Sequence, residues 1–160
     1  MNVHNLFART KCSCEVCKNN CRTISGVLVA EDLIRIMFHL DYGDCMKFAA
    51  EHLNASPGAI AISAGQVFRI PTLVPARAPS GVCHWLDPAG KCEIHSVAPA
   101  GCALFDCKQS KDYQDTVSKE IHKQLMDQWA RPYPSMYAQA WCHLWQHGMR
   151  ARGPEEVRRG

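Results

Sequence analysis

The sequence predicts a small α+β domain, mostly helical with short strands, arranged around an irregular cysteine-rich metal-binding centre. Four segments carry apolar residues at helical spacing, and one segment alternates apolar and polar residues as a strand does. Ten cysteines occur in 160 residues, and eight of them lie in two dense patches. The length and the 47% hydrophobic content suit one domain. We expect it to span residues 1–149, with a basic, mobile tail over residues 150–160.

The first cysteine patch is the segment KCSCEVCKNNCR, residues 11–22. We expect a loop here, because the neighbouring Asn19 and Asn20 favour turns. Its cysteines are Cys12, Cys14, Cys17 and Cys21.

Two short helices should follow the first patch. In residues 31–40 the apolar side chains recur at i, i+3, i+4 and i+7, and Glu31 and Asp32 fall in the first turn, where the helix dipole favours anions. Residues 44–53 repeat the pattern before Pro57 and Gly58 end it. The two helices should form a hairpin.

Residues 59–75 alternate and are rich in β-branched side chains, so we expect one or two short strands, with a hairpin turn at Ala64 and Gly65. The proline-rich stretch over residues 71–81 should be irregular. It leads into the second patch, in which Asp87-Pro88-Ala89-Gly90 is a turn that can pair HWL with CEI. The second patch holds Cys83, Cys92, Cys102 and Cys107.

The C-terminal third predicts two further helices, over residues 111–129 and 135–147. Ser135 suits the cap of the second helix. Its stripe of aromatic side chains is more typical of a core than of a cofactor site.

The charge pattern argues against a nucleic-acid partner, because the formal net charge is only +3 and the C-terminal arginines are interrupted by glutamates. No segment has the apolar length of a membrane span or of a secretion signal, so we expect a cytoplasmic protein. In a reducing compartment, clustered cysteines indicate a metal before disulfides, although disulfides in an exported protein are the alternative. A protein partner stays possible.

Thiolates are the ligands that zinc and iron–sulfur clusters share, with zinc–sulfur bonds of about 2.3 Å. The spacing of these cysteines matches neither a zinc ribbon nor the bacterial ferredoxin run. The sequence therefore predicts a metal site and leaves zinc or an iron–sulfur cluster open.

The order of motifs resembles a known family. An early cysteine cluster ends in Cys21-Arg22 and is followed by Gly26-Val27-Leu28. Then come GVCHWL at residues 81–86, GKCEIH at residues 90–95, and Pro99 before Cys102 and Phe105. In these features the chain is similar to the cysteine-cluster family of zinc- or iron-chelating domains named for a CxxCxxCC motif, although its Cys21 has no adjacent cysteine.

The resemblance implies that eight cysteines make the metal site or sites: Cys12, Cys14, Cys17, Cys21, Cys83, Cys92, Cys102 and Cys107. It implies a metal-binding protein of unassigned role. The alternative is an iron–sulfur enzyme or electron-transfer protein, because some members resemble flagellin lysine N-methylases that hold a cluster. This chain lacks a glycine-rich fingerprint for a methyl donor.

Some residues outside the eight also need an assignment. His95 could be a ligand or support one, and His84 is a weaker candidate. His143 and His147 are spaced i, i+4, and we expect a solvated pair.

Cys45 and Cys142 lie in helical patterns, where we expect small buried side chains. Since Cys12 and Cys14 are too close to share one ion easily, we expect the two patches to interleave, with each site taking ligands from both.

Overall fold

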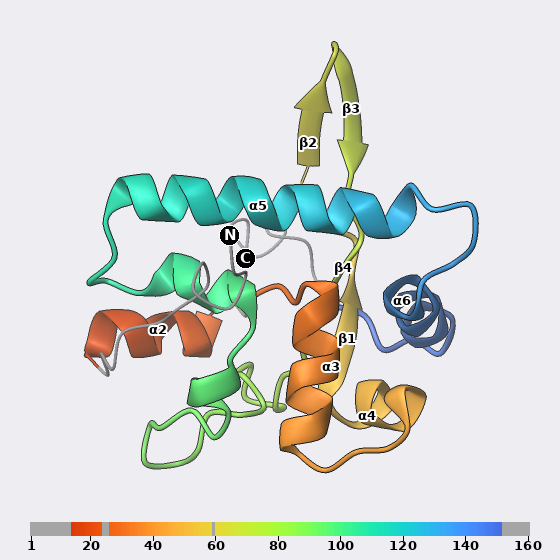
Figure 1. The fold of residues 1–160 in the computed structure, drawn as a ribbon. Coiled ribbons are helices and arrows are strands. Elements are labelled where there is room, and N and C mark those ends of the chain that lie inside the picture. Colours follow the sequence, from red (N-terminus) through yellow and green to blue (C-terminus); the bar gives the residue numbers. More distant parts are fainter. Residues whose placement is uncertain (1–13, 24–25, 59, 152–160) are drawn as a thin grey trace.

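The computed structural model describes residues 14–23, 26–58 and 60–151 (Figure 1). The predicted small α+β domain is confirmed. Cys12 and residues 152–160 of the predicted tail lie outside the described residues, and the single-domain boundary stays a prediction. In chain order the elements are α2 (Glu15–Thr23), α3 (Ala30–His39), α4 (Cys45–His52), β1 (Leu53–Ser56), β2 (Ile60–Ser63), β3 (Gln66–Arg69), β4 (Thr72–Pro75), η1 (His95–Val97), η2 (Ala100–Phe105), α5 (Lys111–Trp129) and α6 (Met136–Gln146).

The helices from α3 onwards begin and end within one residue of their predicted bounds, and α5 matches its prediction at both ends. Capping explains this agreement for the two long helices. The Ser110 hydroxyl accepts a hydrogen bond from the Tyr113 amide at 3.1 Å, and the Ser135 hydroxyl accepts one from the Ala138 amide at 3.1 Å. None of the described helices has the apolar length that crossing a membrane requires.

The predicted loop over the first cysteine patch is wrong, because residues Glu15–Thr23 form the helix α2. Its sequence has no continuous apolar stripe, and polar contacts hold it instead. The Glu15 carboxylate in the first turn pairs with Lys18 at 3.8 Å and with Arg22 at 3.0 Å. The Thr23 hydroxyl donates to the Asn19 carbonyl at 2.9 Å. Charge spacing, rather than hydrophobic period, indicates this helix.

The predicted irregular stretch over residues 71–81 is partly wrong, because Thr72–Pro75 forms β4, which pairs antiparallel with β1. β1 was not expected either, since Leu53 fits the period of the preceding helix. Ala55 lies opposite Leu73 in this ladder, and both side chains are fully buried. The burial available between two distant strands overrides the local helical pattern. Pro75 is tolerated because it stands at the strand end.

β2 and β3 form the predicted hairpin, and Figure 1 shows it projecting beyond α5. The two turn residues, Ala64 and Gly65, have φ angles of 51° and 75°. Positive φ at both central residues is what a tight type I′ hairpin turn needs. Ile62 and Val67 lie opposite each other and are largely exposed.

The core lies between the β1–β4 pair and the helices α3 to α6, and Phe48 and Trp85 are buried in it. Tyr137 on α6 is fully buried and attaches α6 to the bridged residues Leu28 and Leu73. Its hydroxyl donates to the Leu28 carbonyl and accepts from the Leu73 amide, each at 2.7 Å. The aromatic stripe of α6 therefore belongs to the core, as predicted.

Asp32 ties the start of α3 to the start of η2. Its fully buried carboxylate accepts from the Val29 amide at 2.9 Å and from the Ala100 amide at 2.8 Å, and it pairs with the Arg35 guanidinium. Burial raises the pKa of Asp32 to about 6, against the lowering effect of these three donors. The segment that carries Cys102 is thereby attached to α3.

Candidate metal centre

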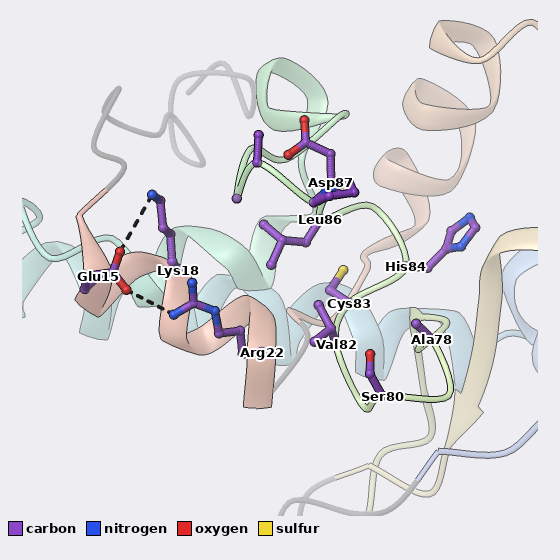
Figure 2. Close-up of a pocket in the computed structure, with 13 residues that line it drawn as sticks. Glu15, Lys18, Arg22, Ala78, Ser80, Val82, Cys83, His84, Leu86 and Asp87 are labelled. Carbon is purple, nitrogen blue, oxygen red and sulfur yellow. Dashed lines mark hydrogen bonds and ion pairs between the residues drawn. The ribbon is translucent and has the colours of Figure 1, made fainter.

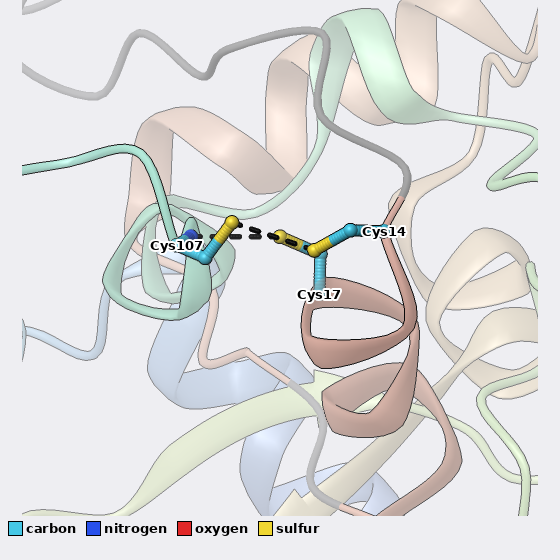
Figure 3. Close-up of side chains that lie close together, drawn as sticks. All are labelled: Cys14, Cys17 and Cys107. Carbon is cyan, nitrogen blue, oxygen red and sulfur yellow. Dashed lines mark hydrogen bonds between the residues drawn. The ribbon is translucent and has the colours of Figure 1, made fainter.

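Three of the predicted ligands converge, and they come from both cysteine patches. The sulfur atoms of Cys14, Cys17 and Cys107 all lie within 4.8 Å of one another. The Cys14 and Cys107 sulfurs are 3.4 Å apart, and the Cys107 amide donates to the Cys17 sulfur at 3.5 Å (Figure 3). Cys17 is buried, whereas Cys14 and Cys107 are exposed. We call these three residues the thiol triad.

Two elements position the triad. Cys14 immediately precedes α2 and Cys17 lies in its first turn, so their spacing of i, i+3 puts both side chains on one helix face. Cys107 follows η2 in a short turn, where the buried Asp106 accepts from the Lys108 amide at 3.1 Å. The cysteine side chains of α2 and of this turn thus point toward one another.

The Cys107 turn is held in place by tight backbone packing around η2. The Gly101 amide donates to the Val27 carbonyl at 3.0 Å. A Cβ atom at Gly26 would lie 2.3 Å from the Cys102 nitrogen and 2.5 Å from its sulfur, so only glycine fits there. From the sequence, Gly26 stands only as part of the family motif and Asp32 only as an anion in the first turn of a helix. A glycine that precedes a cysteine-rich segment in a family motif is the signal that could have identified this support.

The triad has the chemistry of a site for a thiophilic cation. In a tetrahedral zinc site with bonds of about 2.3 Å, sulfur atoms are separated by about 3.8 Å. The sulfurs of Cys14 and Cys107 are 3.4 Å apart, and all three sulfurs lie within 4.8 Å of one another, which is close to this separation. The first turn of α2 also favours negative charge on Cys14 and Cys17 through the helix dipole. A possible cysteine metal-binding site therefore exists in this structure.

Cys21 and Cys83 approach each other at the other end of α2. The Cys83 amide donates to the Cys21 carbonyl at 2.7 Å, and both residues are half-buried. Arg77 is bridged to Cys83 in an isolated β-pair. Burial lowers the pKa of the Arg77 guanidinium, and the Cys83 and Cys21 sulfurs act in the opposite direction, so both sulfurs lie near this cation.

The predicted hairpin between HWL and CEI is present as one antiparallel bridge between Leu86 and Cys92. The Asp87 side chain accepts from the Lys91 amide at 2.8 Å and Gly90 has a φ of 82°, which together close the predicted turn. Cys92 is half-buried on this hairpin, and Cys102 is half-buried against Gly26. Within residues 14–23, 26–58 and 60–151, the thiol triad is the one set of three donors that converges to metal-binding distances.

A pocket of about 570 Å³ lies between α2 and the loop over residues 78–90 (Figure 2). Lys18 and Arg22 line it, but both pair with Glu15, and Asp87 adds a second carboxylate. The charges balance, so the pocket has no clear preference for an anion. Cys83 and His84 lie on the loop opposite α2.

The remaining candidates take less part in the described site. His95 begins η1, and its amide donates to the Cys92 carbonyl at 3.2 Å, but its ring is not in the converging set. The rings of His143 and His147 are tilted by 37° with centres 4.3 Å apart; His147 is exposed, as expected for a solvated pair, whereas His143 is half-buried.

The two cysteines outside the patches behave differently from each other. Cys45 is half-buried, and burial raises the pKa of its thiol. Cys142 is exposed on α6, so the prediction that it is buried is wrong. The aromatic neighbours of Cys142 fill the core side of the helix, and position 142 falls on the opposite side.

Comparison with protein-family models, curated proteins and solved structures gives no match for this chain. The resemblance to the cysteine-cluster family stays a hypothesis drawn from its motifs. The convergence of Cys14, Cys17 and Cys107 is what supports a metal site.

Proposed function

We propose that this protein binds zinc or an iron–sulfur cluster through clustered cysteine thiolates. The observation that carries the proposal is the thiol triad, which joins sulfurs 93 residues apart in the sequence. Three thiols lie together at one place, and two of them, Cys14 and Cys107, are exposed, so an ion can reach them from solvent. A reducing compartment such as the cytoplasm would keep these thiols available for a metal.

We further propose that the eight predicted cysteines form two centres. Cys14 and Cys21 are seven residues apart along α2, which corresponds to about 10 Å at a rise of 1.5 Å per residue. Ligands of one zinc ion are separated by about 3.8 Å, so these two residues belong to different centres. The first centre is built on the thiol triad. Cys21, Cys83, Cys92 and Cys102 would form the second, and metal binding would have to draw these four together, because they do not converge to metal-binding distances in the structure.

Each proposed centre takes ligands from both patches, as the sequence led us to expect. The triad supports this for the first centre. For the second, the support is that a backbone hydrogen bond makes Cys21 and Cys83 neighbours. Metal binding would then attach both ends of α2 to the rest of the domain and would stabilise the folded state.

Metal and sulfide analysis of the purified protein tests the proposal. Zinc without colour supports a zinc protein, whereas a brown protein with equimolar iron and labile sulfide supports the iron–sulfur alternative, including an electron-transfer role or a methylase relative. A fully folded protein that contains neither metal, and takes up neither after reduction, would refute the proposal.

Serine substitutions test the two centres separately. Cys17→Ser and Cys107→Ser should each lose the metal of the first centre and keep that of the second, and Cys83→Ser should do the reverse. Cys142→Ser is the matched control, because this exposed thiol on α6 lies outside both proposed centres, and its metal content should equal that of the wild type. Loss of all metal in every ligand variant would show a single centre instead.

A further inference from the structure

A pair of histidines outside the cysteine set faces ring nitrogen to ring nitrogen. His52 is the last residue of α4, and its Nδ1 lies 2.8 Å from Nε2 of His84, which stands on the loop after β4. The two residues are 32 positions apart, so no sequence spacing reveals the pair. His84 is exposed and His52 is half-buried, which leaves the space between them open to ions from solvent.

The backbone around Ala76 holds the two histidines side by side. The Ala76 amide donates to the His52 carbonyl at 2.8 Å, and the Ala76 carbonyl accepts from the His84 amide at 2.9 Å. The ring of His52 also stacks on the buried indole of Trp85, with centres 5.6 Å apart and planes at 16°. The position of His52 is therefore fixed before any ligand arrives, which lowers the entropic cost of binding.

Hydrogen bonds on the far side of His52 set its tautomer. The Tyr42 hydroxyl donates to the Glu51 carboxylate, and its oxygen lies 2.8 Å from Nε2 of His52. Because this hydroxyl proton is used on Glu51, Nε2 of His52 must be the donor to the tyrosine oxygen. Nδ1 of His52 then carries a lone pair, and it points at His84.

This is the arrangement that protein metal sites use, in which a ligating histidine donates its other ring N–H to an oxygen acceptor that orients the ring. The surrounding charge also favours a cation. His52 lies at the C-terminal end of α4, where the helix dipole is negative. Burial lowers the pKa of His52, and His84 adds to this, while the carboxylates of Glu51 and Glu93 oppose it. Two acidic groups therefore lie near the ring.

We propose that His52 and His84 bind one zinc ion, or a similar divalent first-row ion, through Nδ1 and Nε2 respectively. Imidazole is a preferred ligand for such ions, and water would complete the coordination. Tetrahedral bonds of about 2.0–2.1 Å separate two nitrogens by about 3.3 Å, so the exposed His84 ring moves outward by about half an ångström. The proton on Nε2 of His84 moves to Nδ1 of the same ring, and the ion takes its place between the two nitrogens.

This site does not depend on the cysteine centres. It uses none of their residues, and it would persist if those centres held an iron–sulfur cluster or nothing. The simpler alternative is a hydrogen bond between two neutral imidazoles, with His84 as donor and no affinity for metal.

The zinc content per chain distinguishes a zinc site from a hydrogen bond between neutral imidazoles. It is measured for the full-length protein at one buffered free-zinc concentration. The wild type should hold one equivalent more than His84→Ala, whatever the cysteines hold. Tyr42→Phe should weaken this extra equivalent by about 10- to 100-fold, the usual effect of removing a group that orients a ligand. Equal zinc content in the wild type and His84→Ala would overturn the proposal.

His147→Ala is the matched control. The rings of His143 and His147 are also close, but Nδ1 of His147 is bonded to the His143 carbonyl at 2.8 Å, so their nitrogens do not face each other. This variant should keep the full zinc content, and a loss equal to that of His84→Ala would overturn the assignment.

Imidazole ¹⁵N spectra of the wild type give a second readout that needs no variant. Zinc should shift Nδ1 of His52 and Nε2 of His84 and leave both rings of the control pair unchanged. Unshifted signals from His52 and His84 at saturating zinc would overturn the proposal even if other sites fill.

Discussion

Replacing Asp32 by alanine should cost about 3–5 kcal/mol of the free energy of unfolding. The side chain is fully buried, and its removal leaves the Val29 and Ala100 amides without their acceptor. Each buried donor without a partner costs about 1–3 kcal/mol. The Arg35 guanidinium also loses its carboxylate and keeps only weaker contacts with backbone carbonyls. Because small domains have about 5–15 kcal/mol of stability in total, the loss should be a large share of it.

Urea unfolding followed by tryptophan fluorescence measures this loss, since Trp85 is buried in the core. Wild type and variant are compared both metal-loaded and after chelation. Asp115→Ala is the matched control, because Asp115 pairs with Lys111 on the exposed face of α5, and it should cost less than about 1 kcal/mol. If Asp32→Ala unfolds within about 1 kcal/mol of the wild type, the two backbone bonds to this carboxylate do not hold η2 as described.

Further predictions follow from other buried groups. Gly26→Ala should reduce both the metal content and the free energy of unfolding, because the alanine Cβ has no room beside Cys102. Metal analysis and urea unfolding measure the two losses, and a variant equal to the wild type in both would contradict the prediction. Tyr137→Phe removes one hydroxyl that serves two buried backbone groups and should cost about 2–4 kcal/mol, again by urea unfolding, with a cost near zero as the contrary result. The carboxyl of Asp32 should titrate near pH 6 in a ¹³C spectrum, not near 4. Because its folded-state pKa is raised above the unfolded value, the part of the stability that depends on protonation of Asp32 should be full below about pH 4 and be lost as the pH rises through about 6, while the bonds to the Val29 and Ala100 amides remain.

The helices could be predicted where an apolar stripe and a cap agree. In α5, Val117, Ile121 and Leu125 are spaced by four and are all buried, so period and burial give the same bounds. α2 could not be predicted in this way, because Cys17 is its one buried residue and its order depends on charge pairs. β1 was missed for a different reason: Leu53 fits both a helix and a strand, and the choice is made by pairing with β4.

The candidate site was predicted in its residue types and only partly in its geometry. Cysteine density pointed to Cys14, Cys17 and Cys107, and the structure brings these three together. Which cysteines meet depends on how η2 is fixed to α3 through Asp32, a contact between residues 68 positions apart. No local pattern carries that information. The same limit applies to His52 and His84, which meet only because β4 returns beside β1 and brings Ala76 between the two histidines.

The polar character of α2 has a consequence for how the protein would respond to its surroundings. An ordinary surface helix is retained by its apolar face, whereas α2 contributes a single buried side chain, and that side chain is a proposed ligand. A bound ion would then take the part of the missing hydrophobic face, and the helix would be ordered in proportion to metal occupancy. Cleavage by trypsin after Lys18 or Arg22 should be slow in the loaded protein and fast after chelation. A helix that loosens when metal is scarce would convert the availability of an ion into a change of protein surface, which is the physical requirement for a metal sensor.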